Sequence, residues 1–488
     1  MAQQTSAAAA KATNPGFRLV FALVAAGVAM SNLDLFVVNV AMPDISADFH
    51  GTALSSLSWV LNAYAVVFAA LLVPAGSIAD RTGPRRAYLL GVGVFTAASV
   101  LCAVAPGVWF LVGARVVQAA GAALLIPASL GILLAAAAPE QRTPAIRNWA
   151  ALSGLAAALG PVIGGALAQL DWRWIFLINL PVGVVTVIFG LRALPRTPGH
   201  ATGGPVDLLG AGLLTGGVGA VALGLVKGQS WGWASAGPAI CLGVAVVLLA
   251  LFALHSGRHP SPVLPLDLLR LPSVRPAMLA NLLFAVPFAT MLLSVTLWCQ
   301  DVWSWSALTT GLAIAPGPLM VPLLSKYAGM VGRRIGLGAT ATVGCVLFGL
   351  GLAWWLVRLD PSDHDYLTGL LPGMLLTGIG VCLAMPTLVA TAVSKLPPQN
   401  FSTGSALATM ARQAGGVIGV AGLVAVIGEP RGTDALVHAF DHGWVFGLAG
   451  TVAATLSCCL LLRHTRPAPP ASPARPTTDS VKDVSHGR

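Results

Sequence analysis

The stretch LDLFVVNVAMP, from Leu33 to Pro43, ends the first long apolar run of the chain. That run begins at Phe17, and the charged residue in its interior is Asp34. A carboxylate at membrane depth costs roughly 2.5 to 3.5 kcal/mol on insertion scales. Because a chain seldom keeps such a group without using it, the position predicts that Asp34 takes part in function.

Composition extends this interpretation to the whole chain. Of its 488 residues, 56% are hydrophobic and 9% are charged, with a mean hydropathy of +0.82. Ordinary soluble proteins are about 25% charged, so this chain is predicted to be an integral membrane protein. Lipid satisfies no backbone polar group, which favours an all-α architecture.

The same composition argues against several partners and cofactors. The net charge of +10 comes without a basic cluster interleaved with aromatic residues, so we expect no nucleic acid. No Walker motif is present, so we expect no nucleotide. The seven cysteines lie in apolar spans without CxxC spacing, which argues against a disulfide framework or a metal site. No nucleophile–base set lies at membrane depth, so we do not expect an enzyme.

Fourteen apolar stretches are long enough to cross a membrane, which takes a helix of about 20 residues. They are 17–42, 55–78, 87–105, 107–133, 145–169, 175–193, 207–226, 238–256, 276–298, 306–328, 336–357, 367–393, 403–427 and 443–463. The boundary between the third and fourth rests only on Ala105–Gly107. The sequence therefore predicts fourteen transmembrane helices.

Basic residues are distributed unevenly between these stretches. With the N-terminus inside, the outer segments carry only Arg173, Lys227, Arg358 and Arg431. Most of the other basic residues fall on inner segments, as the positive-inside rule requires. We therefore expect an even number of spans and both termini in the cytoplasm. The bias toward Ala, Gly and Arg indicates a bacterial source and hence the bacterial cytoplasmic membrane.

Weak internal repetition predicts two halves. Gly83–Arg86 and Gly332–Arg334 are similar turns, each followed by a new span. The predicted organisation is a cytoplasmic tail (1–16), a six-helix bundle (17–193), two inserted transmembrane helices (207–256), a cytoplasmic linker (257–275), a second six-helix bundle (276–463) and a disordered cytoplasmic tail (464–488). Paired six-helix bundles are typical of secondary transporters. The alternative is that any inner loop tends to be rich in arginine.

The predicted depths of Asp34 and Arg115 in the membrane make Arg115 a candidate partner of Asp34. Asp34 lies nine residues from Pro43, and Arg115 lies eight residues from Gly107. At about 1.5 Å per residue, both side chains lie roughly 12 to 14 Å below the outer surface. Arg115 favours the charged carboxylate whereas desolvation disfavours it, so Asp34 can load and release a proton. The alternative is a fixed structural ion pair.

Three motifs resemble those of the major facilitator superfamily. The first closes the second span and resembles the family's loop motif G-x-L-A-D-R-x-G-R-[KR], with Pro84 in place of an arginine. Its matching residues are Gly76, Asp80, Arg81, Gly83 and Arg85. The resemblance implies a conformational latch between the two halves on the cytoplasmic side. The alternative is an amphipathic turn that carries inner charge.

The other two motifs lie in the fourth and fifth spans. Arg115 and Gln118 are similar to the superfamily's R-x-x-Q-G-x-G motif, with Ala119 in place of a glycine. The fifth span resembles the antiporter motif G-x-x-x-G-P-x-x-G-G, with Ala156 where the first glycine is usual. Its residues are Gly154, Gly160, Pro161, Gly164 and Gly165. The resemblance implies export, while the alternative is a helix interface of small residues.

Three longer segments of the sequence resemble one family within the superfamily. Leu33–Pro43 with Asp34 and Asn39, the segment 171–183, and Thr409–Gly416 with Arg412 are similar to the fourteen-spanner drug:proton antiporter family (the EmrB/QacA type). The resemblance implies export of small hydrophobic compounds, often antibiotics, driven by the proton gradient without a cofactor. It also implies that Asp34, Arg115, Asn39, Gln118 and Arg412 serve the proton or the substrate.

Alternatives remain at this stage. An uptake porter for a metabolite would share much of the pattern, and a membrane-embedded sensor belongs to another class. Asp34 is the one carboxylate predicted inside the spans, where it faces Arg115 and Arg412. This favours neutral or weakly acidic lipophilic substrates over dications. Arg412 could instead be a structural residue bonded to carbonyls.

Overall fold

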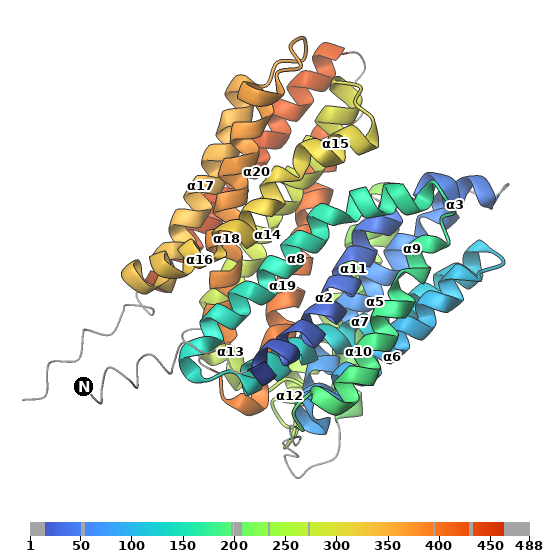
Figure 1. Ribbon diagram of the computed structural model, residues 1–488, viewed down its shortest axis with the longest axis vertical. Coiled ribbons are helices and arrows are strands. Elements are labelled where there is room, and N and C mark those ends of the chain that lie inside the picture. Colours follow the sequence, from blue (N-terminus) through green and yellow to red (C-terminus); the bar gives the residue numbers. More distant parts are fainter. Residues whose placement is uncertain are drawn as a thin grey trace, which may run out of the picture.

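The computed structural model describes residues 15–49, 54–196, 199, 207–232, 235–271, 274–393, 396–428 and 433–462. Every regular element within these ranges is helical (Figure 1). The predicted tails 1–16 and 464–488 fall outside the described residues, except for Pro15 and Gly16.

The long elements correspond to the apolar stretches of the sequence. They are α2 (Pro15–Val40), α5 (Trp59–Thr82), α6 (Pro84–Ala103), α7 (Val108–Ala136), α8 (Pro139–Ala168), α10 (Asn179–Ala193), α11 (Leu208–Trp231), α12 (Ala236–Ser256), α14 (Val274–Leu297), α16 (Pro316–Ile335), α17 (Leu337–Arg358), α18 (Leu371–Val393), α19 (Phe401–Ile427) and α20 (Thr433–Leu462). Short helices connect them: α3 (Met42–Asp48), α4 (Leu54–Leu57), α9 (Trp174–Leu177), α13 (Asp267–Arg270) and α15 (Ala307–Ile314).

Twelve helices of the described chain, and not the predicted fourteen, are long and apolar enough to qualify as membrane spans. The two predicted stretches without such a helix are 145–169 and 306–328. The first lies in α8, several of whose residues, among them 153, 154, 157, 158 and 161, have side chains outside the described part of the structure. The second is divided between α15 and α16, because the prolines at 316 and 318 interrupt it, and α16 ends on Arg333 and Arg334.

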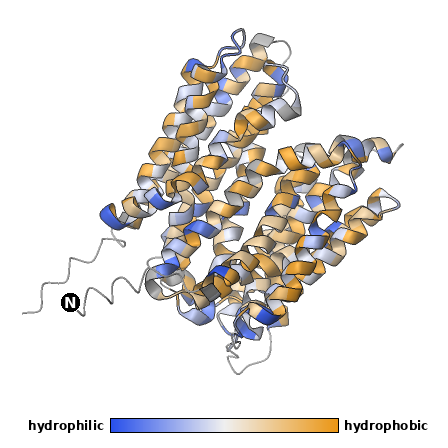
Figure 2. Cartoon of the chain, viewed as in Figure 1, coloured by the Kyte–Doolittle hydropathy of each residue, from blue (hydrophilic) through white to orange (hydrophobic). Residues whose placement is uncertain are grey.

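The helices are arranged in two groups that meet along α8 and α19 (Figure 1). One group contains α2, α5, α6, α7 and α10, and the other contains α14, α16, α17, α18 and α20. Helix α8 packs on α2 and also on α16 and α18, while α19 packs on α14 and also on α5 and α7. Apolar residues dominate the middle of the helices and polar residues collect near their ends (Figure 2). The boundaries predicted for the two bundles remain a prediction.

A close crossing brings α5 and α19 together at the end that is predicted to be cytoplasmic. A Cβ on Gly76 would lie 2.7 Å from the Ala406 Cβ and 2.9 Å from the Ser402 carbonyl oxygen. Only a glycine therefore permits this approach. Immediately below, Gly83 has φ 98°, a left-handed conformation that glycine adopts without strain and that joins α5 to α6.

Candidate functional site

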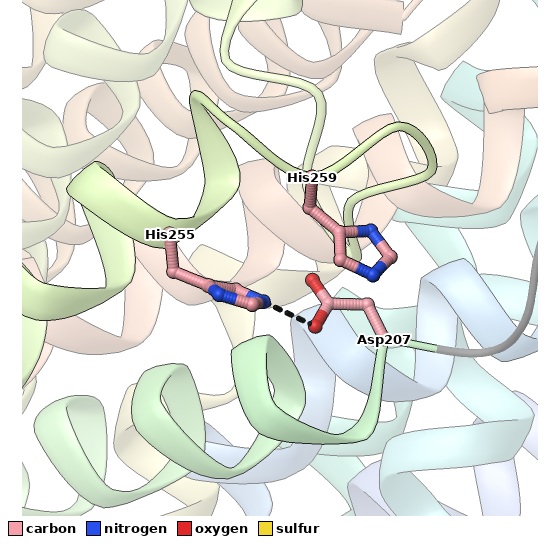
Figure 3. A group of neighbouring side chains, drawn as sticks. All are labelled: Asp207, His255 and His259. Carbon is pink, nitrogen blue, oxygen red and sulfur yellow. Dashed lines mark hydrogen bonds and ion pairs between the residues drawn. The ribbon is translucent and has the colours of Figure 1, made fainter.

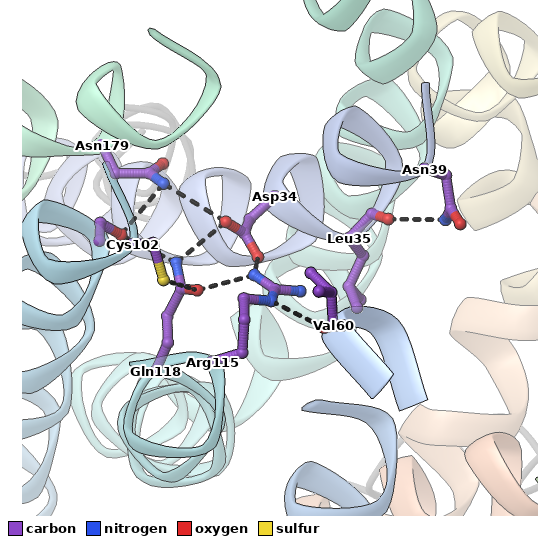
Figure 4. Close-up of polar contacts among 9 residues, drawn as sticks. Asp34, Leu35, Asn39, Val60, Cys102, Arg115, Gln118 and Asn179 are labelled. Atoms are coloured by element: carbon purple, nitrogen blue, oxygen red, sulfur yellow. Dashed lines mark hydrogen bonds and ion pairs between the residues drawn. The ribbon is translucent and has the colours of Figure 1, made fainter. Parts of the chain in front are cut away.

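Asp34 and Arg115 form an ion pair that is sealed from solvent (Figure 4). Nη1 of Arg115, on α7, lies 2.5 Å from Oδ2 of Asp34, on α2. Both residues are 0% exposed. The structure thus brings together the two charges that depth arithmetic placed at one level.

Three neutral polar residues complete the cluster around the second carboxylate oxygen. Nε2 of Gln118 donates to Oδ1 of Asp34 at 2.9 Å and to Oγ of Ser99 at 2.8 Å. Nδ2 of Asn179, on α10, lies 3.5 Å from the same Oδ1 and 3.2 Å from Oγ of Ser99. Each member of the cluster is at most 2% exposed. The side chains of α6, α7 and α10 therefore converge on one carboxylate of α2.

Arg115 is held by further contacts of its own. Its Nη1 also donates to Oε1 of Gln118 at 2.7 Å, and its Nε donates to the Val60 carbonyl oxygen at 3.3 Å. Its guanidinium lies 4.2 Å from the ring centroid of Tyr64, where a cation–π interaction stabilises it. Protonation of Asp34 would remove the counter-charge of Arg115, so the cluster is chemically able to convert a proton into a loosened contact between α2 and α7.

Helix α2 presents a second face to a central cavity of about 340 Å³. Asn32, Phe36 and Asn39 line this cavity, whereas Asp34 does not. Asn39 is exposed, and its Nδ2 donates to the Leu35 carbonyl oxygen at 2.9 Å. The structure thus separates Asn39 from the Asp34 cluster, with which the sequence prediction grouped it.

The cavity lies between the two groups of helices and is mainly apolar. Besides the α2 residues, its walls include Trp149, Phe288, Met291, Thr296, Gln300, Thr310, Ile314, Val321, Met374, Thr377, Val381, Met385, Val389, Thr409 and Arg412. Arg412 of α19 therefore lies at the cavity and apart from Asp34. Its Nη1 lies 4.0 Å from Sδ of Met385.

The predicted latch joins the two groups of helices. Oδ1 of Asp80 accepts from the Ser402 backbone N–H at 3.0 Å, and Oδ2 accepts from the Thr403 backbone N–H at 2.8 Å and from its hydroxyl at 2.7 Å. Ser402 and Thr403 belong to the first turn of α19, where backbone N–H groups lack helical partners. A carboxylate there is worth about 0.3–1 kcal/mol, and up to about 2 when partly buried. Asp80, on α5, thus caps a helix that also packs on α14 of the other group.

The arginines of this motif hold neighbouring backbone. Nη2 of Arg81 donates to the Ser261 carbonyl oxygen at 2.6 Å and to that of Pro262 at 3.2 Å. Nη2 of Arg85 donates to the Leu191 carbonyl oxygen at 2.5 Å. The motif therefore fixes the predicted linker and the end of α10 in addition to α19.

The glycines of α8 lie against α2. A Cβ on Gly160 would overlap the side chain of Phe36, and one on Gly164 would lie 3.0 Å from Cα of Val37. The contact faces the α2 segment that carries Asp34 and the cavity residues. Gly165 lies in the same helix, and the side-chain positions of Gly154 and Pro161 are outside the described part of the structure.

The segment that Arg81 contacts is anchored at a second point (Figure 3). Asp207, His255 and His259 place candidate ligand atoms within 4.8 Å of one another. Nε2 of His255 lies 2.8 Å from Oδ1 of Asp207, which also accepts from the Gly210 backbone N–H at 2.7 Å. Oδ2 of Asp207 accepts from the Val263 backbone N–H at 3.3 Å. Asp207 thus ties α11, α12 and the following segment together by hydrogen bonds.

A family model described as "Major Facilitator Superfamily" matches residues 24–420. The chain belongs to the Major Facilitator Superfamily. Membership makes it a transport protein that crosses the membrane several times, and not an enzyme.

Relatives within the superfamily carry resistance and export names. The chain is 33% identical over 410 residues to the methylenomycin A resistance protein of Streptomyces coelicolor, covering 83% of this chain and 84% of the relative. It is 31% identical to the tetracenomycin C resistance and export protein of Streptomyces glaucescens, covering 82% and 73%. It is 34% identical to the cephamycin export protein of Amycolatopsis lactamdurans, covering 85% of each chain.

A solved structure shares the superfamily fold. The human organic anion transporter MFSD10 superposes with a TM-score of 0.61 at 14% identity, covering 92% of this chain and 100% of that one. At this identity the likeness establishes the fold alone.

Sequence reasoning missed several residues of the Asp34 cluster. Ser99 and Asn179 contact Asp34 or its partners, and Tyr64 stacks on Arg115. Each is a polar or aromatic residue within an apolar stretch, which was the available signal. The sequence alone does not show how α6 and α10 pack against α2 and α7, so it could not assign these residues to the Asp34 site.

Proposed function

We propose that the chain is a proton-coupled antiporter that exports hydrophobic drugs or antibiotics from the bacterial cytoplasm by alternating access. The observation that carries the proposal is the buried Asp34–Arg115 pair. Asp34 lies on one face of α2, and another face of the same helix lines an apolar cavity. The resistance and export names of three relatives support the direction of transport. The proton gradient supplies the energy for export, and no cofactor is needed.

The mechanism begins with Asp34 charged and paired. A proton that enters from outside neutralises Asp34 and releases Arg115, so α2 and α7 can move relative to each other. The Asp80 cap on α19 then opens, and the substrate enters the cavity from the cytoplasm or the inner leaflet. Loss of the proton to the cytoplasm restores the ion pair, and the return to the outward state expels the substrate. One proton driven by about 150 mV supplies roughly 3.5 kcal/mol.

We also propose the fourteen-span arrangement of the drug:proton antiporter family, with both termini in the cytoplasm. Helix α8 has 30 residues, and α15 with α16 continues for most of 307–335, so each is long enough to cross a bilayer of about 30 Å. The packing of α8 between α2 and α16 supports its place in the membrane. The hairpin of α11 and α12 is then an insertion between two six-helix bundles.

Inverted membrane vesicles test the proposed function. Vesicles with the wild-type protein should accumulate a hydrophobic drug when respiration acidifies their interior, and a protonophore should abolish the accumulation. Cells that express the protein should tolerate more of that drug. Accumulation in right-side-out vesicles instead would indicate an uptake porter, and absence of transport by the purified protein would indicate a sensor.

A further inference from the structure

We propose that the exported compound is an amphipathic organic monoanion whose acid group pairs with Arg412. The inference rests on the proposed export function and names its substrate class.

The central cavity carries a positive charge. Among the described residues that line it, Arg412 is the charged one, and the walls hold no carboxylate. The contact of its guanidinium with Met385 is to a thioether sulfur, a weak acceptor that does not neutralise a cation. A guanidinium in an apolar surround is stable when it is paired, so the complementary occupant brings a negative charge.

Asp34 cannot balance a cationic drug in this cavity. It is 0% exposed, and both of its oxygens already accept hydrogen bonds from Arg115 and Gln118. The proton site and the cavity are therefore separate, on opposite faces of α2. A cation in the cavity would meet Arg412 without an acid to offset it.

The walls around Arg412 suit the rest of such a molecule. Thr409 lies one helical turn before Arg412 on α19 and lines the same cavity. Phe36, Trp149 and Phe288 line the same cavity and supply aromatic surface. An aromatic acid can therefore place its charged end at Arg412 and its apolar body against these rings.

Helix α19 connects this cavity to the latch. Asp80 caps the first turn of α19, and Arg412 lies about two to three turns further along the same helix. An anion that binds Arg412 therefore contacts α19, the helix that Asp80 caps.

The charge of the substrate has a consequence for energetics. Exchange of one monoanion leaving for one proton entering moves two positive charges inward. Exchange of one monocation for one proton moves none. Export of the proposed substrate is therefore driven by the membrane potential as well as by the pH gradient.

A matched set of fluorescent probes tests the proposal on the purified full-length protein in nanodiscs. The probes are 7-diethylaminocoumarin-3-carboxylic acid, its methyl ester and its trimethylammonioethyl amide, which are anionic, neutral and cationic. We expect the acid to bind most tightly and the cation most weakly. Arg412→Gln should weaken acid binding by roughly 10- to 100-fold, as expected for the loss of a charged hydrogen-bond partner, and leave the ester unchanged. Arg412→Lys should restore part of the preference.

Gln413→Leu is the matched control, because Gln413 follows Arg412 on α19 and lies outside the walls of this cavity. It should bind all three probes as the wild type does. Equal binding of the three probes, tighter binding of the cation, or equal loss of all three in Arg412→Gln would overturn the proposal. Failure of the acid to bind while protons still drive export of a neutral or cationic drug would overturn the substrate class and leave the export function standing.

Discussion

The carboxylate of Asp34 is buried and is stabilised by hydrogen bonds from its neighbours. Arg115 supplies a charge-assisted hydrogen bond to one oxygen, and Gln118 and Asn179 surround the other. Such a partnered charge accounts for the presence of an acid in an apolar helix, since breaking a buried pair typically costs 3–5 kcal/mol.

Sequence reasoning reached part of this cluster. Equal depth in two spans was enough to bring Asp34 and Arg115 together, because rise per residue in a helix is fixed. It could not find Ser99 or Asn179, whose contribution depends on how helices rotate about their axes. It named Asn39 together with Asp34 as serving the proton or the substrate, and the five-residue step between them along α2 turns the two side chains to different faces.

Removal of a neutral donor should change the pH dependence of export. Gln118→Leu leaves Oδ1 of Asp34 without its 2.9 Å donor and so disfavours the charged form of the carboxylate. The variant should therefore load protons at lower external proton concentration, and the pH profile of export should move to higher pH. Transport measured from external pH 5 to 9 checks this. Gln413→Leu, outside the cluster, should keep the wild-type profile, and an unmoved Gln118→Leu profile would contradict the prediction.

At the scale of elements, α2 and α19 connect the sites. Helix α2 carries Asp34 on one face and Phe36 on another, and α8 packs against it through Gly160 and Gly164. Helix α19 begins at the Asp80 cap and continues to the cavity. The loop motif predicted a latch from sequence, but its partner could not be predicted, because Ser402 and Thr403 are more than 320 residues away in the chain.

A side chain at Gly76 should force the latch open. In Gly76→Leu the new side chain meets the Ala406 Cβ and the Ser402 carbonyl oxygen, so α5 and α19 must separate. We expect export to fall at least tenfold, as a destabilisation of about 1.4 kcal/mol of the latched state implies. A cysteine at Ser405, which is 1% exposed, should become reactive to an impermeant maleimide in inverted vesicles.

Gly93→Leu is the control for this experiment. A Cβ at Gly93 has nothing within 4 Å, so export and labelling should match the wild type. If Ser405→Cys stays unlabelled in Gly76→Leu and export is retained, this crossing is not the latch.

At the scale of the whole molecule, hydropathy predicted the helical membrane architecture but not every boundary. The apolar stretches correspond to long helices, yet the prolines at 316 and 318 divide one of these stretches between α15 and α16. Prolines, Lys326, Arg333 and Arg334 lower the hydropathy of α16, which packs on α8 and α18. The position of α11 against α5 and α19 depends on tertiary packing, which periodicity does not encode.

Cysteine labelling tests the fourteen-span arrangement. If α8 crosses the membrane, Gln141 and Leu170 lie on opposite sides of it. In a variant without the seven native cysteines, Leu170→Cys should react with an impermeant reagent added to intact cells, and Gln141→Cys should react only in inverted vesicles. Reaction of both positions from the same side would contradict the proposed topology.

The central claim is that Asp34 carries the proton whose inward movement drives export of the compound. It is tested most directly by proton movement in liposomes that contain the purified protein and a trapped pH-sensitive dye. Addition of a drug that the wild type exports should produce a coupled proton flux. Asp34→Asn should still bind the drug but move no protons with it, and Asp34→Glu should keep part of the flux. Proton flux at the wild-type rate in Asp34→Asn would contradict the account.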